Sequence, residues 1–390
     1  MTSGRWDRWR RSARDALEAL RHEDPKRQLI SSGLTAAYER AGEPRRLDAE
    51  RERLVIFSDH HRGTGEDDAD DFRRCERAYR AALAYYLEYG FTLALLGDVE
   101  ELWENRIANV LDAYGPVLEL ESLFHREGRL WRFYGNHDLV WSSPDAVDEH
   151  LAAHIGGGPV EVCESLKLDV FAADRLLGRL FLTHGHQGTP SSDLFAPVAM
   201  LPVRYVWPRI QRNVKFASTS PALDFELRAE HDAAMFGWAR RQAWARRPED
   251  PPIVLIAGHT HKPVFFIREA EEPAQRAERT LPTPEEALAA YEAAVGAGAS
   301  VDERATAHAM LEFVRTRDFG PEPLEVKPPC YFNTGCCSYG DGDITGIEIA
   351  DGTIRLVRWL DKEGNPRLEA LTGAEPLAEV FDAVRFARRG

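Results

Sequence analysis

Five short motifs rich in histidine and aspartate occur in a fixed order along this chain. They are Ser58-Asp59-His60-His61, Gly97-Asp98, Gly135-Asn136-His137-Asp138, His184-Gly185-His186 and Gly258-His259-Thr260-His261. Imidazole nitrogens with carboxylate and amide oxygens, and no thiolates, suit Mn²⁺, Fe or Zn²⁺ better than Ca²⁺. The motifs contain enough side chains of these types to predict a site for two divalent metal ions.

The spacing within the motifs predicts how the ligands are shared between the ions. Asp98 stands alone after a glycine, and suits a carboxylate that bridges both ions. Asp59 and His61 are two residues apart, so an extended or turning backbone can aim both at one ion. His259 and His261 have the same spacing and suit one ion each. The remaining predicted ligands are Asn136, through a neutral oxygen, and His184, through a nitrogen.

One histidine of the motifs, His137, is not among the predicted metal ligands, and its position predicts a proton donor. His137 directly follows a predicted ligand, so it would lie beside the ions without binding one. A histidine in that position can protonate a leaving alkoxide, and Asp138 would orient and charge it. The alternative is a hydrogen-bonded structural histidine. With two metal ions that activate a bridging hydroxide, the set predicts hydrolysis of a phosphate ester.

The elements that must position these motifs are predicted strands. Apolar runs at 54–57, 91–96, 130–134, 180–183 and 253–257 each end at a ligand-type side chain. In open α/β sheets, functional sites form at the carboxyl ends of strands, so the five motifs are expected to converge on one edge. Helices are predicted over 71–89 and 105–127, and a β-hairpin over 343–359, with an Asp351-Gly352 turn, is expected to close a second sheet.

The predicted organisation is one interrupted core. A helical N-terminal extension covers 1–46. The core comprises 47–188, 248–267 and 326–370. A helical cap insertion occupies 189–247, a second helical insertion occupies 268–325, and a C-terminal helix covers 371–390.

Composition narrows the class of partner and the compartment. The net charge is −15, which opposes binding to the phosphate backbone, so no nucleic-acid partner is expected. No apolar run reaches the ~18–20 residues that cross a bilayer, and the charged segment 1–21 is not a secretory signal. Five cysteines without a repeated spacing suggest reduced thiols in the cytoplasm. The sequence leaves the oligomeric state open.

The clues to the substrate lie in the predicted cap. The stretch 194–223 has no acidic residue, and its arginines, including Arg204 and Arg209, alternate with apolar and aromatic residues. Such a surface suits a small-molecule or lipid phosphate, or peripheral contact with a membrane; a core segment or a dimer interface is the alternative. Arg62 is a candidate phosphate contact, or else a salt-bridge residue, and His186 is a candidate substrate contact.

The motifs together resemble the calcineurin-like metallophosphoesterase superfamily, over roughly 54–267 and 330–358. That resemblance implies a four-layer αββα sandwich fold with a helical cap insertion, and an Asn-x-Gly turn matched by Asn333-Thr334-Gly335. It assigns Asp59, His61, Asp98 and His261 to one metal ion; Asp98, Asn136, His184 and His259 to the other; and the role of general acid to His137.

Within that superfamily the chain looks most like UDP-2,3-diacylglucosamine hydrolases and their relatives. The shared features are the Ser-Asp-x-His start, Trp103 after Gly97-Asp98, and the long insertion before the last motif. The chain departs from the hydrolases at His137, where they have arginine, and at His186, where they have aspartate. Because of these departures, the substrate of the hydrolases does not carry over to this chain. The predicted cap instead motivates a nucleotide-linked or lipid phosphate as substrate, with a protein or small-molecule phosphomonoester as one alternative and a non-catalytic, metal-stabilised interaction module as another.

Overall fold

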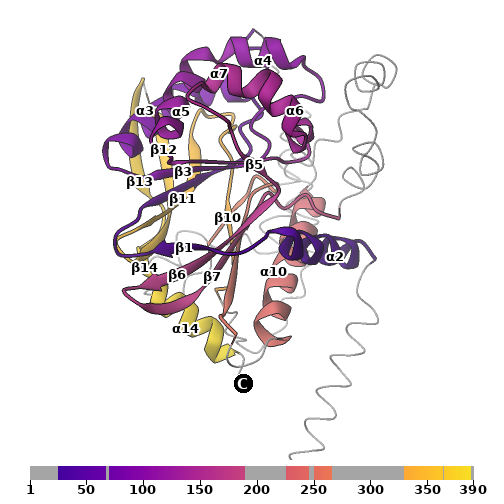
Figure 1. Cartoon of the computed structure of the whole chain (residues 1–390), viewed down its shortest axis with the longest axis vertical. Helices are drawn as coiled ribbons and strands as arrows, with labels where there is room; N and C mark the ends of the chain where they lie inside the picture. The colour runs from indigo at the N-terminus through magenta and orange to yellow at the C-terminus, as the bar shows by residue number, and fades with distance from the viewer. Residues whose placement is uncertain are drawn as a thin grey trace, which may run out of the picture. The chain divides into compact units, whose positions relative to one another are not determined.

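A computed structural model describes residues 25–66, 70–188, 225–245, 250–265, 329–362 and 364–387 (Figure 1). The chain divides into two compact units, residues 1–266 with 328–390 and residues 267–327, and the described residues belong to the first. That unit is a mixed α/β structure with two mixed β-sheets and helices.

The first sheet contains three of the five motif strands. Its order is β13-β12-β11-β2-β3-β4-β5, with β14 paired to β12, and β2, β3, β4 and β5 run parallel. The strands are β2 (Leu54–Phe57), β3 (Thr92–Leu96), β4 (Leu130–Phe133), β5 (Val162–Cys163), β11 (Ile344–Ala350), β12 (Thr353–Lys362), β13 (Asn365–Ala370) and β14 (Glu375–Pro376).

The second sheet contains the other two motif strands, in the order β1-β6-β7-β8-β10-β9. Here β7, β8 and β10 run parallel. The strands are β1 (Arg45–Asp48), β6 (Ser165–Ala172), β7 (Arg175–Thr183), β8 (Ile253–Ala257), β9 (Pro263–Phe265) and β10 (Tyr331–Thr334).

Helices and helical turns connect and cover the sheets. They are α2 (Pro25–Arg40), α3 (Phe72–Glu88), α4 (Ile107–Ala113), α5 (Gly115–Arg126), η1 (Leu139–Ser142), α6 (Pro144–Ala146), η2 (Val147–Leu151), α7 (Ala152–Ile155), α10 (Phe225–Ala245) and α14 (Leu377–Ala387). The predicted helix over 105–127 is divided where Gly115-Pro116 starts a new helix, since proline fits the first turn but not a helix interior.

Strand alternation explains how the two sheets pack. Leu54 and Ile56 of β2 belong to the core cluster that includes the second sheet, whereas Val55 and Phe57 belong to the cluster formed with α3 and α5. Successive side chains of a strand point to opposite faces, so one face of the first sheet covers the second sheet and the other is covered by helices. All four residues are fully buried, which explains why β2 is apolar throughout.

The outer face of the second sheet is covered by α2, α10 and α14. Helix α14 lies so close to β7 that a Cβ atom on Gly178 would be 2.1 Å from Cδ1 of Phe381. Met235 and Trp238 of α10 are also buried in this core. Residues 225–245 of the predicted cap therefore pack against the sheet, and the rest of that cap up to residue 224 lies outside the described residues.

Three expectations about the framework need correction. The hairpin β11–β12 does form, with Asp351 and Gly352 at its turn, but it extends the sheet that contains β2 through antiparallel pairing with that strand. The five motif strands are shared between two sheets. Residues 45–48 form strand β1 beside β6, so the predicted N-terminal helical segment ends earlier. Residues 1–24 and 268–325 lie outside the described part.

Candidate metal centre

All five motifs lie at the carboxyl ends of strands, as the sequence predicts, and two of them are joined by backbone hydrogen bonds. The amides of Asp59 and His61 donate to the carbonyls of Gly97 (3.1 Å) and Asp98 (3.0 Å). The amide of Glu101 donates back to the carbonyl of Arg62 (2.9 Å). These bonds continue the β2–β3 pairing past the strand ends, so Asp59 and Asp98 are held side by side.

The backbone at the predicted ligands adopts a conformation that side chains other than glycine rarely take. Asp59, His61, Asp98, His259 and His261 have φ between 50° and 70°. They are five of the seven non-glycine residues with positive φ in the described part of the chain. Such residues are uncommon and cluster at functional sites. The surrounding structure therefore holds these five side chains in orientations that relaxed strand or helix geometry would not provide.

Two motif glycines are required by the close approach of neighbouring motifs. A Cβ atom on Gly135 would lie 2.1 Å from Oδ1 of Asp98. A Cβ atom on Gly258 would lie 2.4 Å from Oγ of Ser58 and 2.5 Å from Oδ2 of Asp59. The third motif therefore packs directly on the second, and the fifth on the first.

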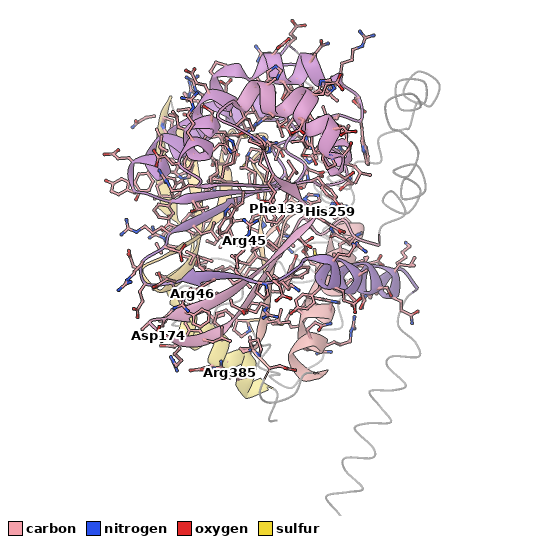
Figure 2. The ribbon with its side chains drawn as sticks, viewed as in Figure 1. Arg45, Arg46, Phe133, Asp174, His259 and Arg385 are labelled. Atoms are coloured by element: carbon pink, nitrogen blue, oxygen red, sulfur yellow. The ribbon has the colours of Figure 1, made fainter. Side chains whose placement is uncertain are left out.

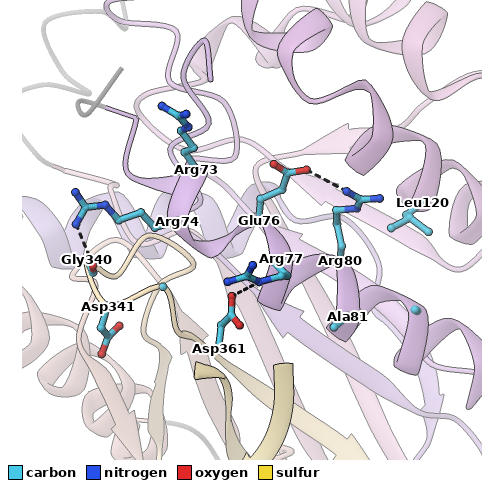
Figure 3. Close-up of a pocket in the computed structure, with 12 residues that line it drawn as sticks. Arg73, Arg74, Glu76, Arg77, Arg80, Ala81, Leu120, Gly340, Asp341 and Asp361 are labelled. Carbon is cyan, nitrogen blue, oxygen red and sulfur yellow. Dashed lines mark hydrogen bonds and ion pairs between the residues drawn. The ribbon is translucent and has the colours of Figure 1, made fainter. Parts of the chain in front are cut away.

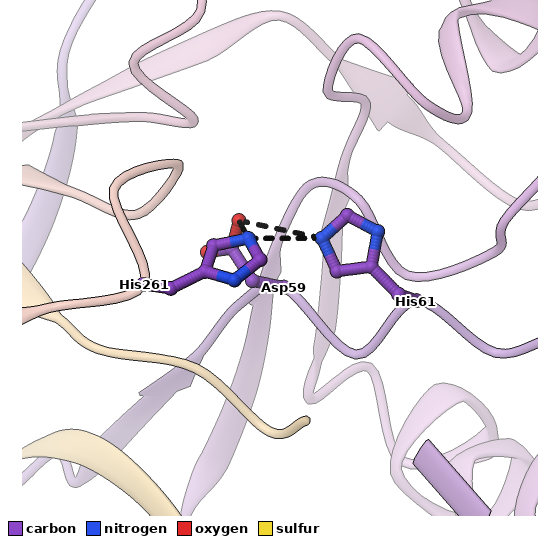
Figure 4. Close-up of side chains that lie close together, drawn as sticks. All are labelled: Asp59, His61 and His261. Carbon is purple, nitrogen blue, oxygen red and sulfur yellow. Dashed lines mark hydrogen bonds and ion pairs between the residues drawn. The ribbon is translucent and has the colours of Figure 1, made fainter. Parts of the chain in front are cut away.

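The first cluster contains Asp59, His61 and His261 (Figure 4). Nε2 of His261 lies 3.0 Å from Nε2 of His61 and 3.3 Å from Oδ1 of Asp59. Burial disfavours a charged His61, but its hydrogen bond with Glu101 and the nearby Asp98 raise its pKa to about 9. Two ring nitrogens and a carboxylate oxygen converge here, and they need a shared proton or a cation.

The second cluster contains Asp98, His184 and His259. Nδ1 of His184 lies 2.8 Å from the carbonyl oxygen of Leu96, so Nδ1 is the donor and Nε2 faces Oδ2 of Asp98 at 3.0 Å. A backbone carbonyl that fixes the tautomer in this way is typical of a metal-binding histidine. Despite burial, Asp98 and Asp59 raise the pKa of His184 to about 9. His259, labelled in Figure 2, has a pKa well below the usual value because of burial and His184.

Asp98 lies between the clusters. Its Oδ2 is 3.0 Å from Nε2 of His184 and 3.9 Å from Nε2 of His61, and its Oδ1 accepts from the amide of His137 (2.8 Å). Burial would raise its pKa, but His184 and His137 hold it well below the usual value. This position matches the predicted bridging carboxylate. Asn136 is also buried, and its Oδ1 has no hydrogen-bond partner.

His137 lies beside the clusters, and its partner is Glu101, a residue that is not among those predicted from the sequence. Nδ1 of His137 is 2.6 Å from Oε2 of Glu101, and the same carboxylate oxygen is 3.2 Å from Nδ1 of His61. The ring stacks on Trp103 with centroids 3.9 Å apart. Burial would raise the pKa of Glu101, yet His137 and His61 lower it to about 2. His137 also forms a possible metal-binding group with His61 and Asp98. The available signal for Glu101 was its position three residues after Asp98.

The predicted role of Asp138 is wrong. Its carboxylate accepts hydrogen bonds from the amides of Gly135 (2.6 Å), Val99 (2.8 Å) and Asp98 (3.3 Å), with no bond to the His137 ring. Burial, with Asp98 and Glu100 nearby, raises its pKa to about 7. The sequence could not reveal that a neighbouring loop presents two of these three donors to this carboxylate. Asp138 joins the second and third motifs instead.

The predicted phosphate contact of Arg62 is also not supported. Its side chain is 1% exposed and pairs with Glu121, with Glu100 3.7 Å away. Arg132 binds the same two glutamates, at 2.7 Å from Glu100 and 3.3 Å from Glu121. Arg62 therefore belongs to a buried network of four charges behind the site. This agrees with the alternative interpretation of Arg62 as a salt-bridge residue.

His186 lies at the site, whereas the predicted substrate contacts in the cap lie outside the described residues. Its ring is 5.4 Å from that of His184 and 6.3 Å from that of Tyr134, and its Nδ1 is buried without a hydrogen-bond partner. Burial and His184 lower its pKa to about 3. Arg204, Arg209 and the whole stretch 194–223 are not among the described residues.

Comparison with known protein families and curated proteins identifies no relative of this chain. No protein-family model matches the chain, and no curated protein is detectably similar to it. In the described residues, no helix is long and apolar enough to span a membrane. What is established is a set of buried histidine and aspartate clusters within metal-binding distance, at the ends of strands from two sheets.

Proposed function

We propose that this chain is a metal-dependent phosphoesterase of the calcineurin-like superfamily, with that superfamily's αββα arrangement of layers. The observation that carries the proposal is convergence. Buried ligand-type side chains from five separate strand ends meet in clusters whose donor atoms lie within 4.8 Å of one another. Of the seven predicted ligands, five are held in the left-handed backbone region.

The residues fit two divalent ions of the Mn, Fe or Zn type. Oδ1 of Asn136 is buried without a hydrogen-bond donor, although buried acceptors normally have partners. The donor set contains nitrogen and oxygen only, which suits these metals. Asp59, His61, Asp98 and His261 would hold one ion, and Asp98, Asn136, His184 and His259 the other. When bound, the ions would supply an activated water and neutralise charge on a phosphoryl group.

The protein's own contribution is positioning and proton transfer. Asp98 is fixed between the clusters by the hydrogen bond from the His137 amide and by its contact with His184. Glu101 accepts from Nδ1–H of His137, which leaves Nε2 as the nitrogen that donates a proton to the leaving oxygen. Trp103 holds the imidazole plane through stacking. The pair of His137 and Glu101 favours hydrolysis of esters whose leaving groups need protonation.

A hydrolysis panel tests the proposal. The purified chain, with added Mn²⁺, is assayed on an aryl phosphodiester, an aryl phosphomonoester, a nucleoside diphosphate conjugate, a phospholipid and a phosphopeptide. Turnover is expected on at least one of them. Asp98→Asn should lower it by at least about a hundredfold, the upper range for weakened metal ligation, while Asp174→Asn, a fully exposed control, should leave it unchanged.

The pattern of turnover separates the candidate functions. Activity on diphosphate conjugates or lipids supports the nucleotide-linked or lipid substrate, and activity on phosphopeptides or small monoesters supports the phosphomonoesterase. Two bound ions with no turnover on the whole panel would support a metal-stabilised interaction module. Turnover that Asp98→Asn leaves intact would refute the proposed site.

A further inference from the structure

Four arginines line one groove of this acidic protein (Figure 3). Arg73, Arg74, Arg77 and Arg80 recur along α3 at spacings of one, three and three residues, which places them near one face over two turns, ~10 Å along the helix axis. The groove has a volume of about 840 Å³ and contains none of the predicted metal ligands. It is therefore a different site from the metal centre.

The carboxylates of the groove are already matched by arginines. Asp361 accepts from Nε of Arg77 at 2.6 Å, and Glu76 lies 3.5 Å from Nη1 of Arg80. Asp341 pairs at 3.0 Å with Arg358, from outside the groove. The lining acids are thus each engaged, and the charges left over belong to arginines.

Two arginines remain without a carboxylate partner in the described part of the chain. Arg74 donates from Nη1 to the carbonyl oxygen of Gly340 (3.2 Å), which leaves its charge uncompensated. Arg73 has no ion pair or side-chain hydrogen bond in those residues, and Figure 3 shows its guanidinium extended away from the helix. In a chain with net charge −15, two adjacent arginines without a carboxylate partner in the described residues mark a place where an anion is favoured.

The start of α3 adds to this preference. Its first turn carries no acidic residue, and Asp71 before it makes no side-chain capping bond. Asp70 is turned away, because its carboxylate accepts from the Tyr114 hydroxyl and the Gly65 amide, each at 2.7 Å. The helix dipole at an N-terminus favours anions, and here it adjoins Arg73 and Arg74.

The other walls set the shape of the ligand. The wall opposite α3 contains Gly340 and Gly342, which present no side chain, and two aspartates, Asp341 and Asp361, which are paired with arginines. Near Arg80 the lining is apolar, with Ala81, Ala84 and Leu120. A single phosphate would reach Arg73 and Arg74 of the first turn only. A linked phosphate can also accept from the guanidinium nitrogens of Arg77 and Arg80 that their carboxylate partners do not use. We propose that this groove binds a di- or triphosphate group, either of inorganic polyphosphate or of a nucleotide whose ring lies on the apolar end.

The test is a calorimetric titration of the full chain with inorganic triphosphate, in EDTA so that metal ions contribute nothing. The groove variant is Arg73→Gln/Arg74→Gln. The control is Arg27→Gln/Arg51→Gln, two exposed arginines outside the groove with the same change in net charge. All four positions are on the surface, so the variants should fold, and thermal unfolding checks that they do.

The wild-type chain should bind triphosphate at one saturable site. Affinity should fall at least about tenfold in the groove variant, which loses two charge-assisted contacts, and less than about twofold in the control, which changes only the long-range field. Absence of saturable binding at millimolar triphosphate, or equal losses in both variants, would overturn the proposal. A nucleoside triphosphate that binds more tightly than triphosphate, and loses that advantage in Leu120→Ser, identifies a nucleotide; equal affinity identifies inorganic polyphosphate.

Discussion

Replacing Glu101 with glutamine tests how the candidate acid is held. Oε2 of Glu101 contacts Nδ1 of both His137 and His61, at 2.6 Å and 3.2 Å. The variant keeps the size of the side chain and removes its charge. If His137 protonates the leaving group, the loss should be largest for substrates that need a proton most.

The magnitude follows from the electrostatics of this carboxylate. Burial opposes its charge, but His137 and His61 lower its pKa from the usual 4.5 to about 2. At about 1.4 kcal/mol per pKa unit, the two rings stabilise the charged carboxylate by ~3 kcal/mol net. If half of this stabilisation energy acts through His137, its loss in Glu101→Gln should slow a step that depends on the His137 proton about tenfold.

The assay compares two leaving groups on the same enzyme with saturating Mn²⁺. For an alkyl phosphate ester, kcat of Glu101→Gln should fall about tenfold, whereas for a p-nitrophenyl ester, whose leaving group needs little protonation, it should fall less than about threefold. Glu104→Gln, an exposed neighbour, serves as the control. Equal losses for both leaving groups would show that Glu101 acts through His61 and the metal ions, and no loss would refute its role altogether.

Three further predictions concern the framework and the pH response. Gly178→Ala should lower the free energy of unfolding by ~1–3 kcal/mol through overpacking, because its new Cβ would meet Phe381, while Gly115→Ala, whose Cβ meets nothing, should be neutral in the same denaturant titration. Arg62→Met should cost ~3–5 kcal/mol by leaving Glu121 buried and less well paired, against ~0–1 kcal/mol for Arg45→Met, whose partner Glu161 is exposed. Equal losses would contradict a structural role for the buried network. Metal-free protein should have its highest melting temperature near pH 6.5. Burial lowers the pKa of His186 to about 3 and that of His259 well below the usual 6.5, so these two buried neutral rings cost stability as pH falls below about 6.5. The Glu101 contribution is present above its usual pKa of 4.5 and is lost as pH falls through about 2. The stabilising contributions of His61 and His184 are present below the usual histidine pKa of 6.5, and they are lost as pH rises through about 9. A melting temperature that is flat across pH 6.5–9 without metal would contradict these assignments.

The sequence predicted the position of the ligands well because apolar strands and their terminal polar residues are local patterns. Leu54–Phe57, Thr92–Leu96 and Ile253–Ala257 are strands, and each is followed by a predicted ligand. It could not predict how these strands divide between the two sheets, because strand pairing depends on contacts between distant segments. β11, for example, joins β2 across nearly three hundred residues of sequence.

The partners of the site residues were harder to predict for the same reason. Asp138 is adjacent to His137 in sequence, but its carboxylate faces amides of the second motif, and Glu101 takes the expected place. Arg62 adjoins His61, yet alternation of the backbone turns it toward Glu121 on α5. Residue type identified the ligands, whereas direction and burial, which arise from tertiary packing, decided the roles of the residues beside them.

Metal stoichiometry tests the central claim most directly. The chain is stripped with chelator, titrated with Mn²⁺ at pH 8 and measured by calorimetry and by electron paramagnetic resonance, which detects coupling between neighbouring ions. Two ions per chain with magnetic coupling are expected, because Asp98 lies between both clusters, and Asp98→Asn should abolish the coupling. Fewer than one ion per chain, or two uncoupled ions that Asp98→Asn does not affect, would contradict a dinuclear centre at these residues.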